Sequence, residues 1–252
     1  MSTVTRELIG LHRRELMRDK RYFWFALLFP LVMMSIFLVL STLMPKVEGA
    51  PDFTGVAIPM ALFLAVTSTA LIVTSGSLAT MRSKGVLRLM GTTPAGRGRL
   101  LATHMAVRVV MVVVQAVGLL AIAAMVAGLE VSAIPALLGI TLLGMAMFGG
   151  IGYLIGGRMN SPDAASNFSV LIQMLGLFLS GLAFPFQLMP EGVVKVLSLL
   201  PTSFFANLML TQITGAKPYH PAWLSIVVMV ATALAAAYAA VVTFKWDQGE
   251  GR

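Results

Sequence analysis

Side chains that could do chemistry are few in this sequence, and most of them are hydroxyls and amides. The 252 residues include no cysteine and three histidines, His12, His104 and His220. Without cysteine there is no disulfide, thiol nucleophile or thiolate ligand. The histidines lie far apart along the chain, and no Asp or Glu falls inside the long apolar runs, so a serine there has no base to activate it. We therefore expect no catalytic residue and no metal ligand.

Polar residues instead follow one face of two apolar runs. Residues 164–190 carry Ser166, Ser169, Gln173 and Ser180, at spacings that place them on one helical face. Residues 53–81 carry a second group, Thr67, Ser68, Thr74 and Ser75. Because lipid offers no hydrogen-bond partner, these groups should face another helix or a polar pathway. The alternative is that the hydroxyls bond carbonyls of their own helix.

The composition places these runs in a membrane. Hydrophobic residues make up 58% of the chain and charged residues 11%, against about 25% charged in soluble domains. A bilayer core of about 30 Å needs roughly 20 apolar residues of helix. We predict an all-α integral membrane protein forming one domain over 1–252. Its six transmembrane helices are expected at 22–45, 53–81, 101–128, 132–157, 164–185 and 221–244.

A seventh apolar run, 196–216, contains Pro201 and many polar side chains. Unpartnered polar groups in hydrocarbon cost several kcal/mol each, so we predict that this run is broken and only partly inserted. Basic residues set the orientation: six precede the first span and five lie between the second and third. Both termini are therefore predicted to be cytoplasmic, and the net charge of +8 needs no nucleic-acid partner. If 196–216 did span, the C-terminus would lie outside.

Two segments outside the spans are amphipathic. Residues 1–21 place Val4, Leu8 and Leu11 at helical spacing among basic residues, which predicts an interfacial helix; a solvated tail that only signals orientation is the alternative. Between spans two and three, Val86–Met90 form a short apolar strip among cations, bounded by Gly85 and Pro94. So short a helix needs either a membrane surface or a partner protein beside it.

Two features inside the spans predict packing. Gly152 and Gly156 form a GxxxG pair, which lets two helix backbones approach closely. Arg108 lies inside the third apolar region but only about 10 Å along the helix from the basic loop. We expect its long side chain to reach back to the membrane surface.

Two motifs in this frame resemble those of the membrane subunits of ABC-2 type (type V) ABC exporters, among them drug-resistance permeases of actinobacteria. In the loop after span two, Arg82, Gly85, Leu87, Thr93 and Pro94 match the family spacing. After span five, the stretch from Ser180 to Pro190, followed by Pro201, is similar to the family's outer re-entrant helical hairpin.

The resemblance implies roles for three groups of residues. A short coupling helix would rest on a separate ATPase, through Arg82, Lys84, Gly85, Leu87, Arg88, Met90 and Pro94. The polar residues of spans two and five would line the translocation path or the dimer seam. The extracellular re-entrant segment, 186–216, would be shaped by Phe184, Pro185, Met189, Pro190 and Pro201.

The resemblance further implies a multi-pass permease in the cytoplasmic membrane of a bacterial cell. Two copies, identical or not, would pair with two ATP-binding subunits, and ATP and Mg would be bound there, not by this chain. We expect export of an apolar or amphipathic compound, such as a drug, an antibiotic or a lipid. Two alternatives remain: a scaffold or immunity protein that binds without transporting, and a membrane-embedded enzyme acting on lipid.

Overall fold

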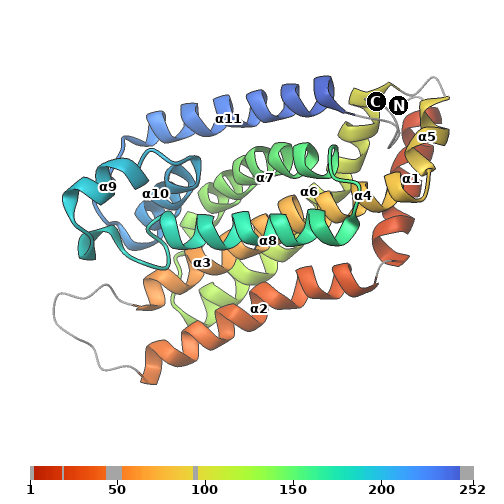
Figure 1. The fold of residues 1–252 in the computed structure, drawn as a ribbon. Coiled ribbons are helices and arrows are strands. Elements are labelled where there is room, and N and C mark those ends of the chain that lie inside the picture. The colour runs from red at the N-terminus through yellow and green to blue at the C-terminus, as the bar shows by residue number, and fades with distance from the viewer. Residues whose placement is uncertain (1–2, 19, 44–52, 93–95, 245–252) are drawn as a thin grey trace.

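The structure, a computed structural model, describes residues 3–18, 20–43, 53–92 and 96–244, and within these ranges all regular secondary structure is helical (Figure 1). Most helices run roughly along one axis and form a bundle. The first half of the chain contains α1 (Thr3–Arg18), α2 (Lys20–Leu43), α3 (Phe53–Thr67), η1 (Ser68–Val73), α4 (Thr74–Ser83), α5 (Val86–Gly91) and α6 (Arg97–Val126). The second half contains η2 (Val131–Ala133), α7 (Ile134–Gly156), α8 (Pro162–Leu179), η3 (Phe186–Leu188), α9 (Glu191–Leu197), α10 (Pro201–Thr214) and α11 (Ala222–Thr243).

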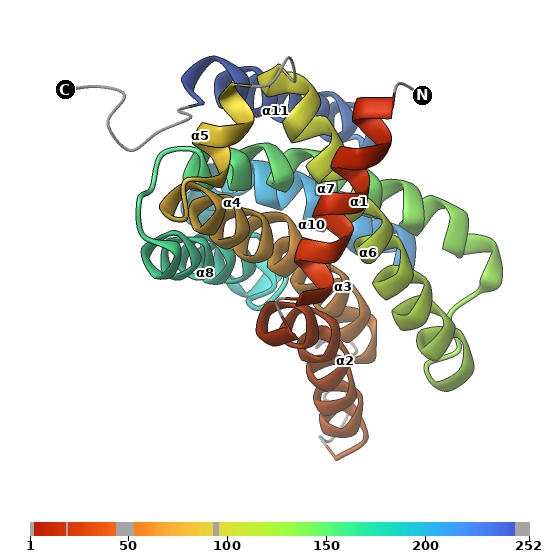
Figure 2. The ribbon, with the colours of Figure 1, turned by 90° about the vertical axis from the view of Figure 1, so that its right-hand side faces the viewer.

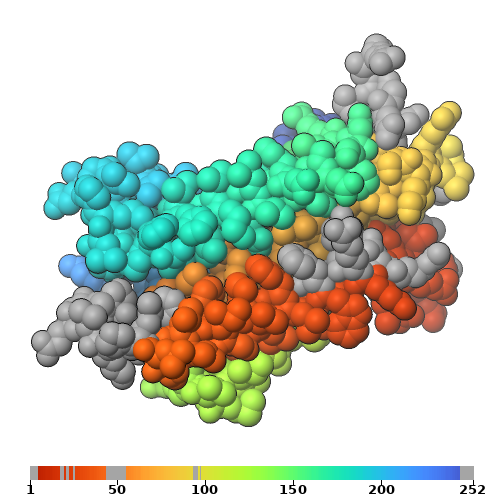
Figure 3. Space-filling view, turned by 60° about the horizontal axis from the view of Figure 1, so that its bottom comes forward, coloured from red at the N-terminus to blue at the C-terminus, as the bar shows by residue number. Residues whose placement is uncertain are grey.

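The continuous helical stretch α3–η1–α4 forms the centre of the bundle. Its most apolar 18-residue window is entirely buried. Helix α2 packs along α3, α8 packs along η1 and α4, and α7 packs against all three segments. Only part of the central stretch stays visible between α8 and α2 (Figure 3). Its hydroxyl side chains from Thr67 to Ser77 are therefore covered by protein instead of lipid.

A π-helical segment, η1, interrupts the central stretch. Thr74 Oγ1 donates to the carbonyl of Thr69, five residues earlier, at 2.9 Å. A π turn contains one more residue than an α turn, and such turns cluster at functional positions.

The predicted GxxxG contact is confirmed. A Cβ atom at Gly152 would collide with the carbonyl oxygen of Ala70 in η1, and one at Gly156 would lie 2.7 Å from the carbonyl oxygen of Ser75. Only glycine allows α7 to approach the central stretch this closely.

Among the residues that the structure describes, five helical stretches are long and apolar enough to cross a membrane, and up to six if a bent pair counts as one span. The five lie in α2, in α3–η1–α4, in α6, in η2–α7 and in α11. Helix α8 has 18 residues but is not among them, because Asp163, Asn167 and Gln173 lower its hydropathy. The bent pair is α9 with α10, at 103°. The chain breaks where Pro201 begins α10, as the polar composition of this segment predicts.

The bundle has two distinct ends (Figure 1). One end, called here the α5 end, carries α1, α5 and the end of α11; the other, the α9 end, carries α9 and the start of α11. Viewed from the α5 end, α1 lies against α6 (Figure 2). The N-terminal segment is therefore a helix docked on the bundle, which excludes the alternative of a solvated tail.

Candidate functional site

Helix α5 lies at the α5 end of the bundle with one face buried and the other exposed. Gly85 precedes it with a φ of +70°, a conformation that glycine adopts without strain. Leu87 is fully buried among Leu78, Leu100 and Tyr153. Leu89 on the opposite face is 72% exposed, and Lys84 and Arg88 are exposed beside it. The predicted short helix is thus fixed by one leucine and presents a basic, apolar surface outward.

The remaining residues predicted for the coupling segment are placed differently. Met90 is half-buried, and Pro94 lies outside the described residues. Arg82 is buried and donates to the carbonyls of Gly157 and Met159, the latter at 3.2 Å. These carbonyls follow the C-terminus of α7, where a positive charge is favourable. Arg82 therefore joins α4 to α7 and does not contribute to the outward face of α5.

The polar residues of the predicted spans two and five meet inside the chain. Gln173 Nε2 on α8 donates to Thr67 Oγ1 at 2.7 Å and lies 3.4 Å from the carbonyl of Leu64. Ser75 and Ser169 share a hydrogen bond of 2.7 Å. Ser166 and Ser180 on the same face are also buried. We call this contact between α8 and the central stretch α3–η1–α4 the polar seam. The polar face of α8 therefore meets another helix, which is one of the two partners that the spacing predicted.

Several seam hydroxyls also bond their own helix. Thr67, Ser68 and Ser180 donate to carbonyls three or four residues earlier, and Thr74 bonds the carbonyl of Thr69. Both predicted kinds of hydrogen bond therefore occur. Most of these hydroxyls bond a carbonyl of their own helix, and Thr67 and Ser75 also bond side chains of α8. In this conformation every residue predicted for the path is buried.

The residues predicted to shape the hairpin lie at its turns. Pro185 and Pro190 precede η3 and α9, and Pro201 begins α10. Phe184 is exposed, with its ring centroid 5.6 Å from that of Phe178, and Met189 follows η3. Sequence reasoning missed Asn207, which joins α10 to the start of α11. Its amide donates to the carbonyl of His220 at 2.9 Å and to Ser225 Oγ at 3.0 Å, and it accepts from the Tyr219 N–H at 2.9 Å.

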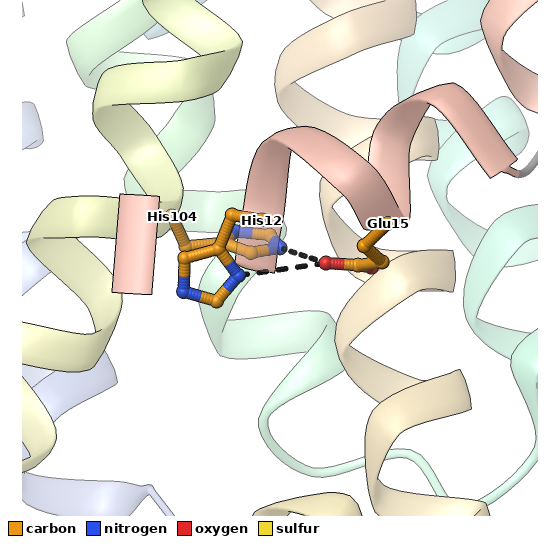
Figure 4. A group of neighbouring side chains, drawn as sticks. All are labelled: His12, Glu15 and His104. Atoms are coloured by element: carbon orange, nitrogen blue, oxygen red, sulfur yellow. Dashed lines mark hydrogen bonds and ion pairs between the residues drawn. The ribbon is translucent and has the colours of Figure 1, made fainter. Parts of the chain in front are cut away.

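Sequence reasoning also missed a buried cluster between α1 and α6. His12 and Glu15 on α1 lie beside His104 on α6 (Figure 4), although the sequence separates the histidines widely. His104 Nδ1 lies 2.8 Å from Tyr153 Oη, and His104 Nε2 lies 3.0 Å from Ser77 Oγ. Burial raises the pKa of Glu15, but hydrogen bonds with His12 and Ser77 and the charge of Arg108 outweigh it, so the pKa lies below its usual value.

The side chain of Arg108 is 0% exposed and lies inside the bundle; that it reaches the membrane surface stays a prediction. Its Nη2 donates to Ser77 Oγ at 2.8 Å and lies 3.6 Å from Glu15 Oε1. Helix α1 brings this carboxylate to the buried guanidinium, a contact that the spacing within the span could not reveal.

The geometry combines a multi-pass helical bundle, a short helix exposed at one end and a broken hairpin at the other. The sequence profile of the ABC-2 family transporter proteins matches residues 40–242. The chain belongs to this ABC-2 transporter family. A comparison with curated proteins finds no match. Membership identifies a multi-pass membrane component of an ABC transporter, and it implies an ABC ATP-binding subunit as partner.

Proposed function

We propose that this ABC-2 family protein is the permease subunit of an exporter in the cytoplasmic membrane of a bacterial cell. A separate ATP-binding subunit supplies the energy and binds the ATP and Mg. The observation that supports this proposal best is the two-sided α5, with Leu87 held in the core and Leu89 and Arg88 outside. A helix that packs into the core with one face can transmit to the core a displacement that a partner imposes on its exposed face.

In this proposal α5 is the coupling helix. Arg88, Leu89 and Lys84 contact the ATP-binding subunit, while Gly85 allows the turn from α4 into α5. Movement of α5 passes into α4 because Leu87 packs against Leu78 and Met81 of α4. The π segment η1 is the point at which α4 changes its angle to α3. ATP binding then shifts a pre-existing inward-open to outward-open equilibrium.

We propose that the polar seam opens toward the path during this cycle. Separation of α8 from the central stretch α3–η1–α4 would expose Thr67, Ser75, Ser169 and Gln173 to a translocating molecule. The residues with own-helix bonds would stay hydrogen-bonded, which lowers the cost of opening. Two copies of the permease, identical or not, would face each other across the path, with two ATP-binding subunits beneath them.

The substrate class follows from the chemistry of the seam. Its side chains are hydroxyls and one amide, with no fixed charge. A path of this kind suits an apolar or amphipathic compound, such as a drug, an antibiotic or a lipid. The 18 methionines of the chain supply adaptable apolar surface.

Whole-cell efflux tests the proposal. Cells that lack the gene should accumulate more of at least one member of a probe panel: ethidium, a lipophilic antibiotic and a fluorescent phospholipid. The gene should restore efflux only together with its ATP-binding subunit. Unchanged accumulation of every probe after deletion would contradict the exporter. Binding of a probe by the purified protein without any efflux would favour the scaffold alternative, and chemical modification of the phospholipid would favour the enzyme.

A further inference from the structure

The cluster between α1 and α6 contains the donor atoms of a metal site. His12 and Glu15 lie on α1, His104 lies on α6, and one ligand atom from each lies within 4.8 Å of the other two. Both histidines are fully buried, and the Glu15 side chain is 24% exposed. Both imidazoles point toward the Glu15 carboxylate (Figure 4).

The two oxygens of Glu15 have different surroundings. Oε1 accepts a hydrogen bond from Ser77 and lies 3.6 Å from Arg108 Nη2. Oε2 lies 3.5 Å from His12 Nδ1 and 3.9 Å from His104 Nε2. One oxygen is thus held by a second layer of residues, while the other faces both histidines. A carboxylate whose orientation is fixed in this way is pre-organised to bind a metal.

The orientation of the His104 ring is also fixed by a hydrogen bond to its other nitrogen, Nδ1. Its Nδ1 lies 2.8 Å from the hydroxyl of Tyr153 on α7. His104 Nε2 lies 3.0 Å from Ser77 Oγ and 3.9 Å from Glu15 Oε2. With the proton on Nδ1 and the Ser77 hydroxyl donating to Glu15 Oε1, the lone pair of Nε2 is available to a metal ion. Metal-bound histidines usually have such a partner on the second nitrogen. His12 Nε2 is buried without a hydrogen-bond partner, so no bond on that side of the ring opposes the small rotation that closes the site.

Two imidazole nitrogens and one carboxylate oxygen form a donor set of zinc. Zinc bonds of about 2.0–2.1 Å place tetrahedral ligand atoms roughly 3.4 Å apart. The shortest separation here is 3.5 Å and the longest is within 4.8 Å. Mg²⁺ and Ca²⁺ prefer six or more oxygens, of which this cluster offers too few. The charge of Arg108 lies on the side of Oε1 and weakens the attraction for any cation without blocking Oε2.

We propose that His12, Glu15 and His104 bind Zn²⁺, with water in the fourth position. The ion joins α1 to α6 and thereby fixes the N-terminal helix on the bundle, next to Ser77 of α4. This site is independent of export, since it needs neither the ATP-binding subunit nor a transported compound.

Isothermal titration of the full-length permease in nanodiscs with Zn²⁺ tests the site. The protein is purified through a tag without histidine and stripped with a chelator. We expect one Zn²⁺ per chain and no competition from Mg²⁺. His12→Gln, His104→Gln and Glu15→Gln should each weaken binding at least about tenfold. His220→Gln is the matched control, because His220 lies in the hairpin at the α9 end, and it should bind as the wild type does.

Tyr153→Phe is a smaller change, because it removes only the hydroxyl that lies 2.8 Å from His104 Nδ1. It should weaken Zn²⁺ binding by about tenfold while the chelator-treated protein keeps its elution volume. Co²⁺ should give the visible absorption bands of a tetrahedral site in the wild type and lose them in His104→Gln. The proposal is overturned if monodisperse wild-type protein binds no Zn²⁺. It is equally overturned if the His12→Gln/His104→Gln double variant binds as tightly as the wild type.

Discussion

At the scale of single residues, three hydrogen bonds between buried polar side chains join pairs of helices. Gln173 with Thr67, Ser169 with Ser75, and Asn207 with Ser225 each join two helices. Hydrogen bonds between transmembrane helices contribute about 0.6 kcal/mol on average. These hydrogen bonds mainly determine which helix faces pack against each other, because a polar group left without a partner in hydrocarbon costs several kcal/mol.

The pair formed by Glu15 and Arg108 predicts unequal effects of single and double substitutions. Glu15→Gln leaves the fully buried Arg108 without its counter-charge and should destabilise the protein by roughly 3–5 kcal/mol. Glu15→Gln/Arg108→Met removes both charges and should recover most of that loss. Thermal unfolding of the chelator-treated permease measures both. A double variant less stable than the single one would contradict the role of the pair.

The lowered pKa of Glu15 predicts how this contribution depends on pH. The folded protein favours the ionised carboxylate, so the stabilisation is fully present above the ordinary Glu pKa of about 4.3. It is lost as the pH falls through the lowered pKa of the folded state. The difference in unfolding temperature between wild type and Glu15→Gln should therefore be large at neutral pH and shrink below about pH 4. A difference that grows on acidification would have the wrong sign.

At the scale of helices, apolar runs and prolines predict most elements, but contacts between distant elements escape prediction. The broken hairpin follows from Pro201 and the polar residues around it, and the close α7 contact follows from Gly152 and Gly156. The π turn of η1 could not be predicted, since its composition also suits an α-helix. The meeting of His12 with His104 could not be predicted either, because it depends on how α1 docks against α6.

Helix α5 predicts opposite outcomes for two neighbouring leucines. Leu87→Asp places a charge in the core formed with Leu78 and Tyr153 and should prevent folding. Leu89→Asp alters only an exposed side chain, so the protein should elute as the wild type does but no longer co-purify with its ATP-binding subunit. Normal retention of that subunit by Leu89→Asp would refute α5 as the docking helix.

At the scale of the whole molecule, the order of helices places α1, α5 and the end of α11 together. The basic residues before span one and between spans two and three predict that this end is cytoplasmic. Sequence reasoning supplied this orientation and the family, whereas the structure supplied the internal partners of the polar seam.

The absence of native cysteine makes the orientation easy to test. Ser83 is exposed at the end of α4, and Gly192 is exposed on α9, so Ser83→Cys and Gly192→Cys place one thiol near each end of the bundle. In intact cells a membrane-impermeant maleimide should label Gly192→Cys and spare Ser83→Cys until the membrane is opened. Labelling of Ser83→Cys alone in intact cells would mean that the protein is oriented the other way.

We propose above all that this permease moves compounds only when a separate ATPase acts on α5. ATP hydrolysis and ethidium transport in proteoliposomes containing the permease, its ATP-binding subunit, or both test this proposal. We expect ATP-dependent transport and several-fold stimulated hydrolysis only with both, and neither with Leu89→Asp. Transport by the permease alone, or hydrolysis by the ATP-binding subunit that the permease leaves unchanged, would contradict it.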